Sequence, residues 1–283
     1  MNNDLLLPAL LALLIVFVLA VGLGRWIHRQ ERRRGLIEQR DQPLVGDGIG
    51  GAFGFIGGSA AFLLGVLMLT SIDHFKATEE IARDEAIAYS AAYDATAAAP
   101  ADLQPQIRRD LACLMRSVVQ DSWSAVEAED LTGDENTQAW TLRAYATLNA
   151  VESERSTEQA AMERIEDGLA EAVKAGQSRL LSARASMPMP LWVVVYVSLF
   201  IVFLFVTLLL RPYPPFESLA LGTILMLTAA MLWTLAAYQA PFNKSDGVYI
   251  APEALEAVMT RLRDVYPGPA WEPCERLATS ERG

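Results

Sequence analysis

The sequence predicts an all-α membrane protein with four transmembrane helices and an extramembrane helical bundle between the second and third of them. The main observation is a set of four uncharged, mostly apolar runs of ~20 residues or more, each long enough to cross a bilayer as a helix. The second is a long polar segment after the second run, in which apolar residues recur at helical spacing. No run alternates in hydrophobicity, which disfavours a β-barrel. The four runs are residues 5–24, 48–72, 191–210 and 219–238.

These runs divide the chain into four parts, and its charge is concentrated in one of them. Residues 1–72 hold the first two transmembrane helices and a basic loop, residues 188–240 hold the last two, and residues 241–283 form a tail. The soluble domain, residues 73–187, carries 21 acidic and 11 basic residues, whereas the whole chain has a net charge of −11. Such a surface repels nucleic acid and attracts cations. We therefore expect no nucleic-acid partner.

A cluster of arginines after the first run indicates the orientation. Basic residues beside a transmembrane helix mark its cytoplasmic end. The first helix then has its N-terminus outside, and both the soluble domain and the C-terminal tail lie outside the cytoplasm. Binding of anionic lipid headgroups is the alternative role for this cluster. The cluster consists of Arg25, Arg29, Arg32, Arg33 and Arg34, with only Glu31 among them.

The second run is unusually rich in small residues. Gly46, Gly50, Gly54 and Gly58 recur every four residues and so follow one side of a helix. A second row of Gly57, Ala61 and Gly65 lies next to it. In a membrane, such rows allow close approach between helices, within one chain or between copies. The other interpretation is a narrow pore lined by backbone and small side chains.

The second transmembrane helix is expected to continue into the soluble domain. No glycine or proline interrupts the chain between the end of the run and Pro100, so one helix of ~50 residues is predicted. A second helix is expected over residues 106–130, a third capped by Thr137, and a fourth opening at Ser156. Each has one apolar face. Together they predict four helices packed antiparallel.

The tail is expected to hold a short amphipathic helix beginning near Pro252 and an extended, proline-rich end from Tyr266. The only two cysteines are Cys113, in the second soluble helix, and Cys274, in this tail. The orientation above places both in an oxidising compartment, where a disulfide between them is favoured. Two unrelated thiols are the alternative.

The sequence shows no catalytic or cofactor motif. It contains no nucleotide-binding glycine loop, no metal-ligand spacing and no nucleophile motif, so we expect neither an enzyme nor a bound cofactor or metal. The interiors of all four apolar runs lack acidic and basic residues, including histidine. A proton-coupled carrier usually holds such a residue within the membrane, so its absence argues against one. A passive pore remains compatible with the composition.

Several motifs resemble the bacterial bestrophin-like domain family. The glycine-rich second run continues into ARDEAIAYSAAYDAT at residues 82–96, with Glu85 and Ala86 in the place of the family's Glu-Ala pair. DLACLMRSVVQDSW follows at residues 110–123, although Ser122 stands where an acid is common before the tryptophan. After the fourth run come Pro241-Phe242, Gly247-Val248 and Pro252-Glu253. The segment 243–245 between them is longer and more polar than the family pattern.

The resemblance implies a protein of the bacterial inner membrane related to bestrophins, which are pentameric anion channels whose second transmembrane helix lines the pore. It implies a homo-oligomer in lipid, with the pore lined by the second run. Phe53, Phe55 and Phe62 would form an apolar constriction, alongside Gly50, Gly54, Gly58 and Gly65. One feature differs. The soluble domain of bestrophins is cytoplasmic, whereas the arginines place this one outside.

Two functions follow from these observations. The first is an oligomeric ion channel built around the second transmembrane helix. The second is a membrane sensor or scaffold that does not transport, in which the outer domain binds a partner and the glycines pack a dimer. The side of the helix that carries Gly50, Gly54 and Gly58 discriminates between them, since a channel needs it to face a water-filled axis.

Overall fold

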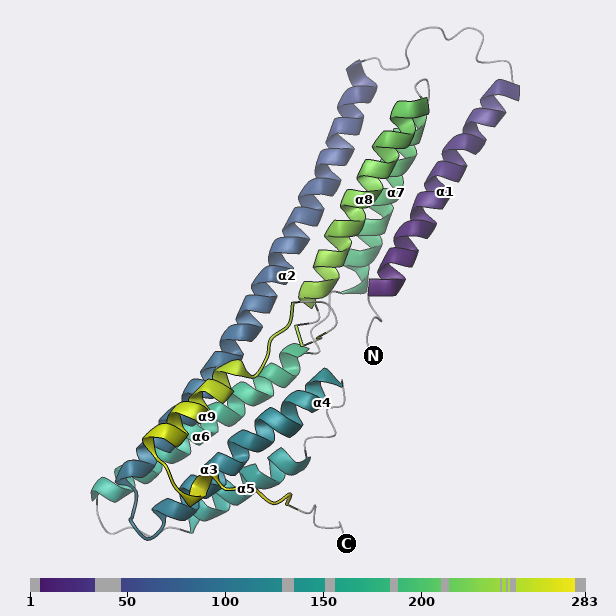
Figure 1. Ribbon diagram of the computed structural model, residues 1–283. Helices are drawn as coiled ribbons and strands as arrows, with labels where there is room; N and C mark the ends of the chain where they lie inside the picture. The colour runs from purple at the N-terminus through teal and green to yellow at the C-terminus, as the bar shows by residue number, and fades with distance from the viewer. Residues whose placement is uncertain are drawn as a thin grey trace. The chain divides into compact units, whose positions relative to one another are not determined.

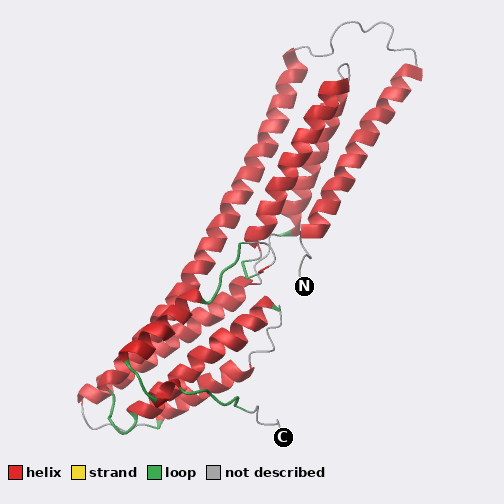
Figure 2. Cartoon of the chain, viewed as in Figure 1, coloured by secondary structure: helices red, strands yellow, loops and turns green. Residues whose placement is uncertain are grey.

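The computed structural model describes residues 6–33, 47–128, 135–150, 156–183, 188–209, 214–239, 241–242, 244 and 248–277. Every regular element in this part of the chain is helical (Figures 1 and 2). The α-helices are α1 (Leu6–Arg33), α2 (Asp47–Ala95), α3 (Gln104–Ser117), α4 (Trp123–Glu127), α5 (Glu135–Asn149), α6 (Ser156–Ala183), α7 (Met189–Leu209), α8 (Pro214–Gln239) and α9 (Glu253–Val265). The shorter helical turns are η1 (Thr96–Ala98), the π-helical η2 (Val118–Ser122) and η4 (Pro269–Trp271).

The chain forms two compact units that share α2. Unit 1 comprises Met1–His74 and Ser186–Ala240, and unit 2 comprises Phe75–Ala185 and Pro241–Gly283. In the described part of the chain, four helices are long and apolar enough to cross a membrane, as the sequence predicts. They lie in α1, α2, α7 and α8.

In unit 1, α1 lies alongside α7 and α8 through an apolar core (Figure 1). Phe17 and Phe203 meet edge to face in this core, with their ring centroids 5.2 Å apart. The Tyr196 hydroxyl donates a hydrogen bond of 3.0 Å to the Ala9 carbonyl and so joins α7 to α1. The helix α2 contributes only its side with Ala60 and Leu67 to this core.

The helix α2 runs without interruption for 49 residues, which confirms the predicted length of ~50. It gives way to η1, and Ala99 then adopts an extended conformation before Pro100. Thr96 fixes this turn, because its hydroxyl accepts a hydrogen bond from Arg108 Nε at 2.8 Å and its carbonyl accepts one from Gln104 Nε2 at 2.7 Å.

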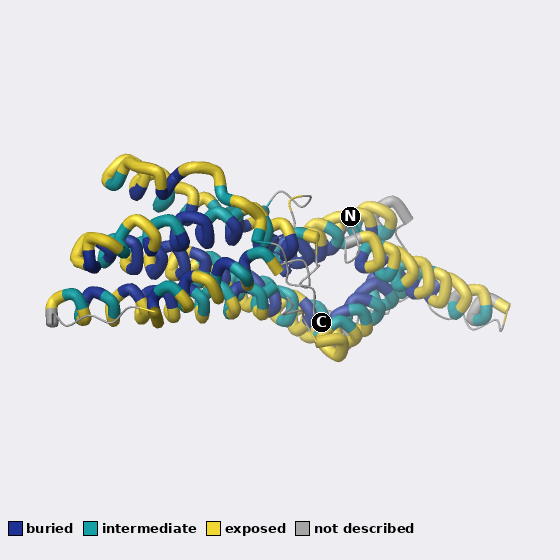
Figure 3. The backbone as a smooth tube through the Cα atoms, turned by 90° about the horizontal axis from the view of Figure 1, so that it is seen from below, coloured by how far each residue is buried: buried dark blue, intermediate teal, exposed yellow. Residues whose placement is uncertain are grey.

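Unit 2 packs α3, α5, α6 and α9 with the second half of α2 around one apolar core. Figure 3 shows these helices buried along their inner sides and exposed along their outer ones. The apolar faces expected from the sequence are the ones that are buried. They include Tyr89 and Tyr93 of α2, Ile107 and Leu111 of α3, Trp140 and Ala144 of α5, Ile165 and Leu169 of α6, and Leu255 and Leu262 of α9.

One local expectation is confirmed with a change, and two others were wrong in part. The helix expected over residues 106–130 is helical over residues 104–127, with the π-helical η2 lying between α3 and α4. Thr137 does not cap α5, because the helix already begins at Glu135 and the buried Thr137 hydroxyl has no hydrogen-bond partner among the described residues. The tail beyond Tyr266 is not simply extended, since η4 forms within it and buries Trp271.

Candidate functional site

One side of α2 in unit 1 is open. A Cβ atom added at Gly51, Gly54, Gly58 or Gly65 would have no described residue within 4 Å, apart from its neighbours along α2 itself. Large apolar side chains stand beside these glycines: Phe55 is 77% exposed, Phe62 is 73% exposed and Leu69 is 62% exposed. We call this surface the Gly/Phe face; it consists of Gly51, Gly54, Phe55, Gly58, Phe62, Gly65 and Leu69.

The Gly/Phe face has a seven-residue period. Gly51, Gly58 and Gly65 are spaced seven residues apart. Phe55, Phe62 and Leu69 follow with the same spacing, each four residues after a glycine. A seven-residue repeat keeps a seam on one side of two supercoiled helices, and each large residue can then insert where the facing helix has a small one. Small glycines and large apolar side chains therefore alternate along one side of a single helix.

The opposite side of α2 explains why the Gly/Phe face is free. Ala60 and Leu67 are buried, and Ile56, Leu63 and Leu64 pack partly against the core of unit 1. At 100° per residue these side chains lie roughly opposite the seam of Gly51, Gly58 and Gly65. The contacts of α2 with its own chain thus use one side and leave the other available.

The residues predicted to line a pore can now be placed. Gly54, Phe55, Gly58, Phe62 and Gly65 all lie on the Gly/Phe face. Gly50 and Phe53 belong to α2, but their side-chain surroundings lie outside the described part of the structure. Gly51 and Leu69 were not among the predicted residues, because the prediction was based on glycines at every fourth position. The seven-residue repeat was the signal that would have found them.

A disulfide joins Cys113 of α3 to Cys274 of the tail, with the Cα atoms 5.7 Å apart, as the sequence favours. Two arginines of α3 hold the same stretch of tail. Arg109 donates hydrogen bonds to the carbonyls of Pro269, Glu272 and Pro273 at 3.0, 2.9 and 2.7 Å. Arg116 donates to the carbonyls of Trp271 and Glu272. The tail is therefore fixed by covalent, polar and apolar contacts together.

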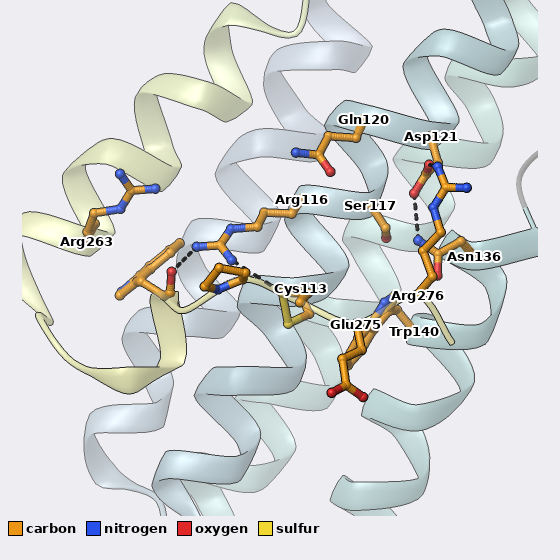
Figure 4. A pocket seen from close by; sticks show the side chains of 13 residues that line it. Cys113, Arg116, Ser117, Gln120, Asp121, Asn136, Trp140, Arg263, Glu275 and Arg276 are labelled. Atoms are coloured by element: carbon orange, nitrogen blue, oxygen red, sulfur yellow. Dashed lines mark hydrogen bonds and ion pairs between the residues drawn. A yellow bond between two sulfur atoms is a disulfide. The ribbon is translucent and has the colours of Figure 1, made fainter. Parts of the chain in front are cut away.

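A hollow of about 370 Å³ lies beside this disulfide (Figure 4). Its walls come from α3 and η2, the start of α5, α9 and the tail. Polar side chains predominate, including Arg116, Gln120 and Arg263. Asp121 is engaged at one end, where it accepts a hydrogen bond of 2.7 Å from Asn136 Nδ2 and lies 3.6 Å from Arg276 Nη2.

A buried ion pair links three helices of unit 2. Arg179 of α6 donates from Nε to Glu85 Oε2 of α2 at 2.8 Å and from Nη2 to the Ser122 hydroxyl at 3.1 Å. Its guanidinium also lies 4.5 Å from the ring centroid of Trp123. Three residues named in the family motifs, Glu85, Ser122 and Trp123, therefore meet at one arginine. Ser122, where an acid is common, contributes an uncharged acceptor to it.

The described residues hold no group of three or more histidine, cysteine or carboxylate side chains placed to bind a metal ion. The arrangement offers instead an apolar helix face within unit 1 and a cross-linked polar region within unit 2.

Comparison with known proteins identifies one family. The family model described as Bestrophin-like domain matches residues 15–252, which is well over half of the chain. The matched residues run from within α1 to the residue before α9, so Cys274 and the tethered tail lie beyond them. No curated protein and no solved structure matches the chain.

Proposed function

The chain belongs to the bestrophin-like domain family, and on that premise we propose that its copies assemble in the membrane around α2 and form an ion channel. The observation that carries this proposal is the Gly/Phe face. The chain's own described residues leave this face of α2 uncovered within unit 1, and it alternates small and large residues every seven positions.

Assembly through this face is physically favourable in a bilayer. Lipid tails are as apolar as phenylalanine, so helices associate there through close packing rather than through a hydrophobic effect. Glycines permit that close packing, and the exposed rings of Phe55 and Phe62 fit spaces of glycine size on a neighbouring copy. In a ring of copies, the part of the face with Phe55 and Phe62 packs against a neighbouring helix, while the part with Gly54 and Gly58 borders a central water-filled axis, as in a passive pore.

Charge favours cations as the conducted ions. The apolar runs contribute no ionisable group to a pore interior, so selectivity would come from the soluble part. Residues 73–187 carry a net charge of −10, from 21 acidic and 11 basic residues. Such a potential concentrates cations and opposes anions, most strongly at low ionic strength.

We place unit 2 outside the cytoplasm of a bacterial inner membrane. The arginines after the first apolar run mark its cytoplasmic end. The Cys113–Cys274 disulfide agrees with this placement, because disulfides persist in oxidising compartments. Alkaline phosphatase fused after Gly283 should be active and a cytoplasm-dependent fluorescent protein should not. The reverse pattern would overturn the orientation.

Ion flux tests the channel directly. Purified protein in liposomes is assayed for cation and anion flux separately, comparing the natural chain with Gly54→Trp. Gly222→Trp is the matched control, because Gly222 of α8 also has nothing within 4 Å of an added Cβ but is not on α2. We expect cation flux that Gly54→Trp abolishes and Gly222→Trp leaves within about twofold. Absence of flux from folded, inserted protein would reject the channel and favour the sensor or scaffold, in which the Gly/Phe face packs a dimer.

A further inference from the structure

Three arginines surround the tethered tail without a carboxylate partner. Arg109, Arg116 and Arg263 form no ion pair with any carboxylate among the described residues. Arg109 and Arg116 donate to tail carbonyls, whereas Arg263 of α9 lies over the Trp271 ring, 5.6 Å from its centroid. Such a concentration of unpaired positive charge is unexpected in a chain with a net charge of −11.

The three charges act on one another. Partial burial lowers the pKa of Arg116, and the charges of Arg263 and Arg109 lower it further. The guanidinium groups are nevertheless kept near each other, since the tail carbonyls orient Arg116 and the Trp271 ring supports Arg263. An anion between the arginines would offset the repulsion between their positive charges. It would also supply hydrogen-bond acceptors in place of the water that burial removes.

There is space for such an anion. Two hollows, of about 370 and 350 Å³, are both lined by Arg116, Gln120 and Arg263. Figure 4 shows the guanidinium groups of Arg116 and Arg263 and the amide of Gln120 around the same opening. In the described structure, the side chains of Gln120 and Arg263 donate no hydrogen bond to protein, so their N–H groups are available to a ligand.

We propose that this position binds a small oxyanion, a carboxylate or phosphate group, between Arg116 and Arg263, with the Gln120 amide as a third donor. Guanidinium groups suit both oxyanions because they donate two parallel hydrogen bonds. Glu256 lines one hollow, and Glu275 and Asp121 line the other. These negative charges limit the ligand to a single terminal oxyanion rather than a polyanion. The site is separate from the proposed channel, and α9 lies beyond the family match.

The disulfide should control this site. Arg116 contacts the Cys274 sulfur at 3.4 Å and the carbonyls of Trp271 and Glu272, and Trp271 in turn supports Arg263. Reduction frees the segment that positions both arginines. The affinity for the oxyanion therefore depends on the closed disulfide. By linkage, a bound oxyanion makes the disulfide harder to reduce.

Isothermal titration of the full-length protein in detergent tests the site. Sodium phosphate and sodium succinate are titrated separately at constant ionic strength. Arg263→Gln is compared with Arg261→Gln, a matched control that removes the same charge from α9 at a residue paired with Asp94. We expect Arg263→Gln to weaken binding at least about tenfold, the contribution of one charge-assisted hydrogen bond, and Arg261→Gln to leave it unchanged. No binding, or equal weakening in both variants, would overturn the proposal.

Two further arms identify the source of the oxyanion and its coupling to the disulfide. A soluble short-chain phosphatidic acid that binds more tightly than phosphate assigns the site to a lipid headgroup, whereas equal affinity assigns it to a free oxyanion. After reduction, phosphate binding should be lost. Undiminished binding in protein shown by mass to hold two free thiols would overturn the coupling.

Discussion

The glycines of α2 and those of α6 have opposite surroundings, although both sets lie within long helices. A Cβ added at Gly168 of α6 would lie 3.0 Å from the backbone nitrogen of Ala92, and one at Gly176 would lie 2.9 Å from Glu85 Oε1. The same addition at Gly54 or Gly58 of α2 would meet nothing within 4 Å. The glycines of α6 are therefore explained by packing within the chain, and those of α2 are not.

This difference shows which glycines have packing partners within the chain and which do not. Each glycine costs a helix about 1 kcal/mol relative to alanine in water, so a set of them in one helix needs a compensating contact. In α6 the compensation is the close approach to α2 and to the buried Glu85. For the first half of α2 we propose that it comes from another copy of the chain, which is the assembly proposed above.

Cross-links show the same contrast. Unit 2 contains a disulfide, a buried ion pair and two arginines that fix the tail. The described helices of unit 1 are held mainly by apolar side chains. Substitutions in unit 2 should therefore destabilise the single chain, whereas substitutions on the Gly/Phe face should affect only assembly and flux.

The largest stability effect is expected from the disulfide. Replacing Cys113 and Cys274 together by alanine opens a loop with a sequence separation of 161 residues. Loop-closure entropy alone gives a loss of up to about 5 kcal/mol in the free energy of unfolding of unit 2. Denaturant unfolding followed by tryptophan fluorescence measures it. A loss below about 1 kcal/mol would mean that the arginines and Trp271 suffice to hold the tail.

Breaking the buried ion pair should cost nearly as much. Arg179→Met leaves the Glu85 carboxylate buried without its partner, which typically costs about 3–5 kcal/mol. The matched control is Arg83→Met, since Arg83 pairs with Glu79 on the surface of α2 with side-chain exposures of 64% and 40%. Surface pairs contribute about 0–1 kcal/mol. The same unfolding assay measures both variants. An equal loss in the free energy of unfolding for Arg179→Met and Arg83→Met would show that burial of the ion pair does not matter.

A smaller effect should separate the two kinds of glycine. Gly168→Ala forces the α6 backbone away from Ala92 and should destabilise unit 2 by about 1–3 kcal/mol. Gly222→Ala in α8 meets nothing and should be neutral or stabilising by up to about 1 kcal/mol. Thermal unfolding in detergent measures both. A tolerated Gly168→Ala would remove the contrast between packed and open glycines.

Local patterns in the sequence predicted much of the fold. The continuous α2 follows from the absence of glycine and proline before Pro100, and the buried faces follow from helical spacing. The disulfide was favoured because the chain has only two cysteines and one expected compartment for both. These features depend on composition and short-range order, which a sequence displays directly.

The features that escaped prediction depend on tertiary contacts. Glu85 and Arg179 are 94 positions apart, and nothing local indicates that they pair. The π-helical turn at η2 inserts one residue without disturbing the apolar pattern noticeably. Glycines occur on more than one side of α2, so the sequence alone did not reveal which side the chain covers. The covered side is the one on which Ala60 and Leu67 pack into the core of unit 1.

Cross-linking within native membranes tests most directly whether the Gly/Phe face meets another copy. Phe62→Cys places a thiol on that face, and Ala60→Cys places one on the side buried in unit 1, while the natural cysteines stay in their disulfide. Treatment with a short bis-maleimide should yield covalent dimers of Phe62→Cys and none of Ala60→Cys. Monomers alone from Phe62→Cys, with its thiol shown to react with a single maleimide, would contradict assembly around α2.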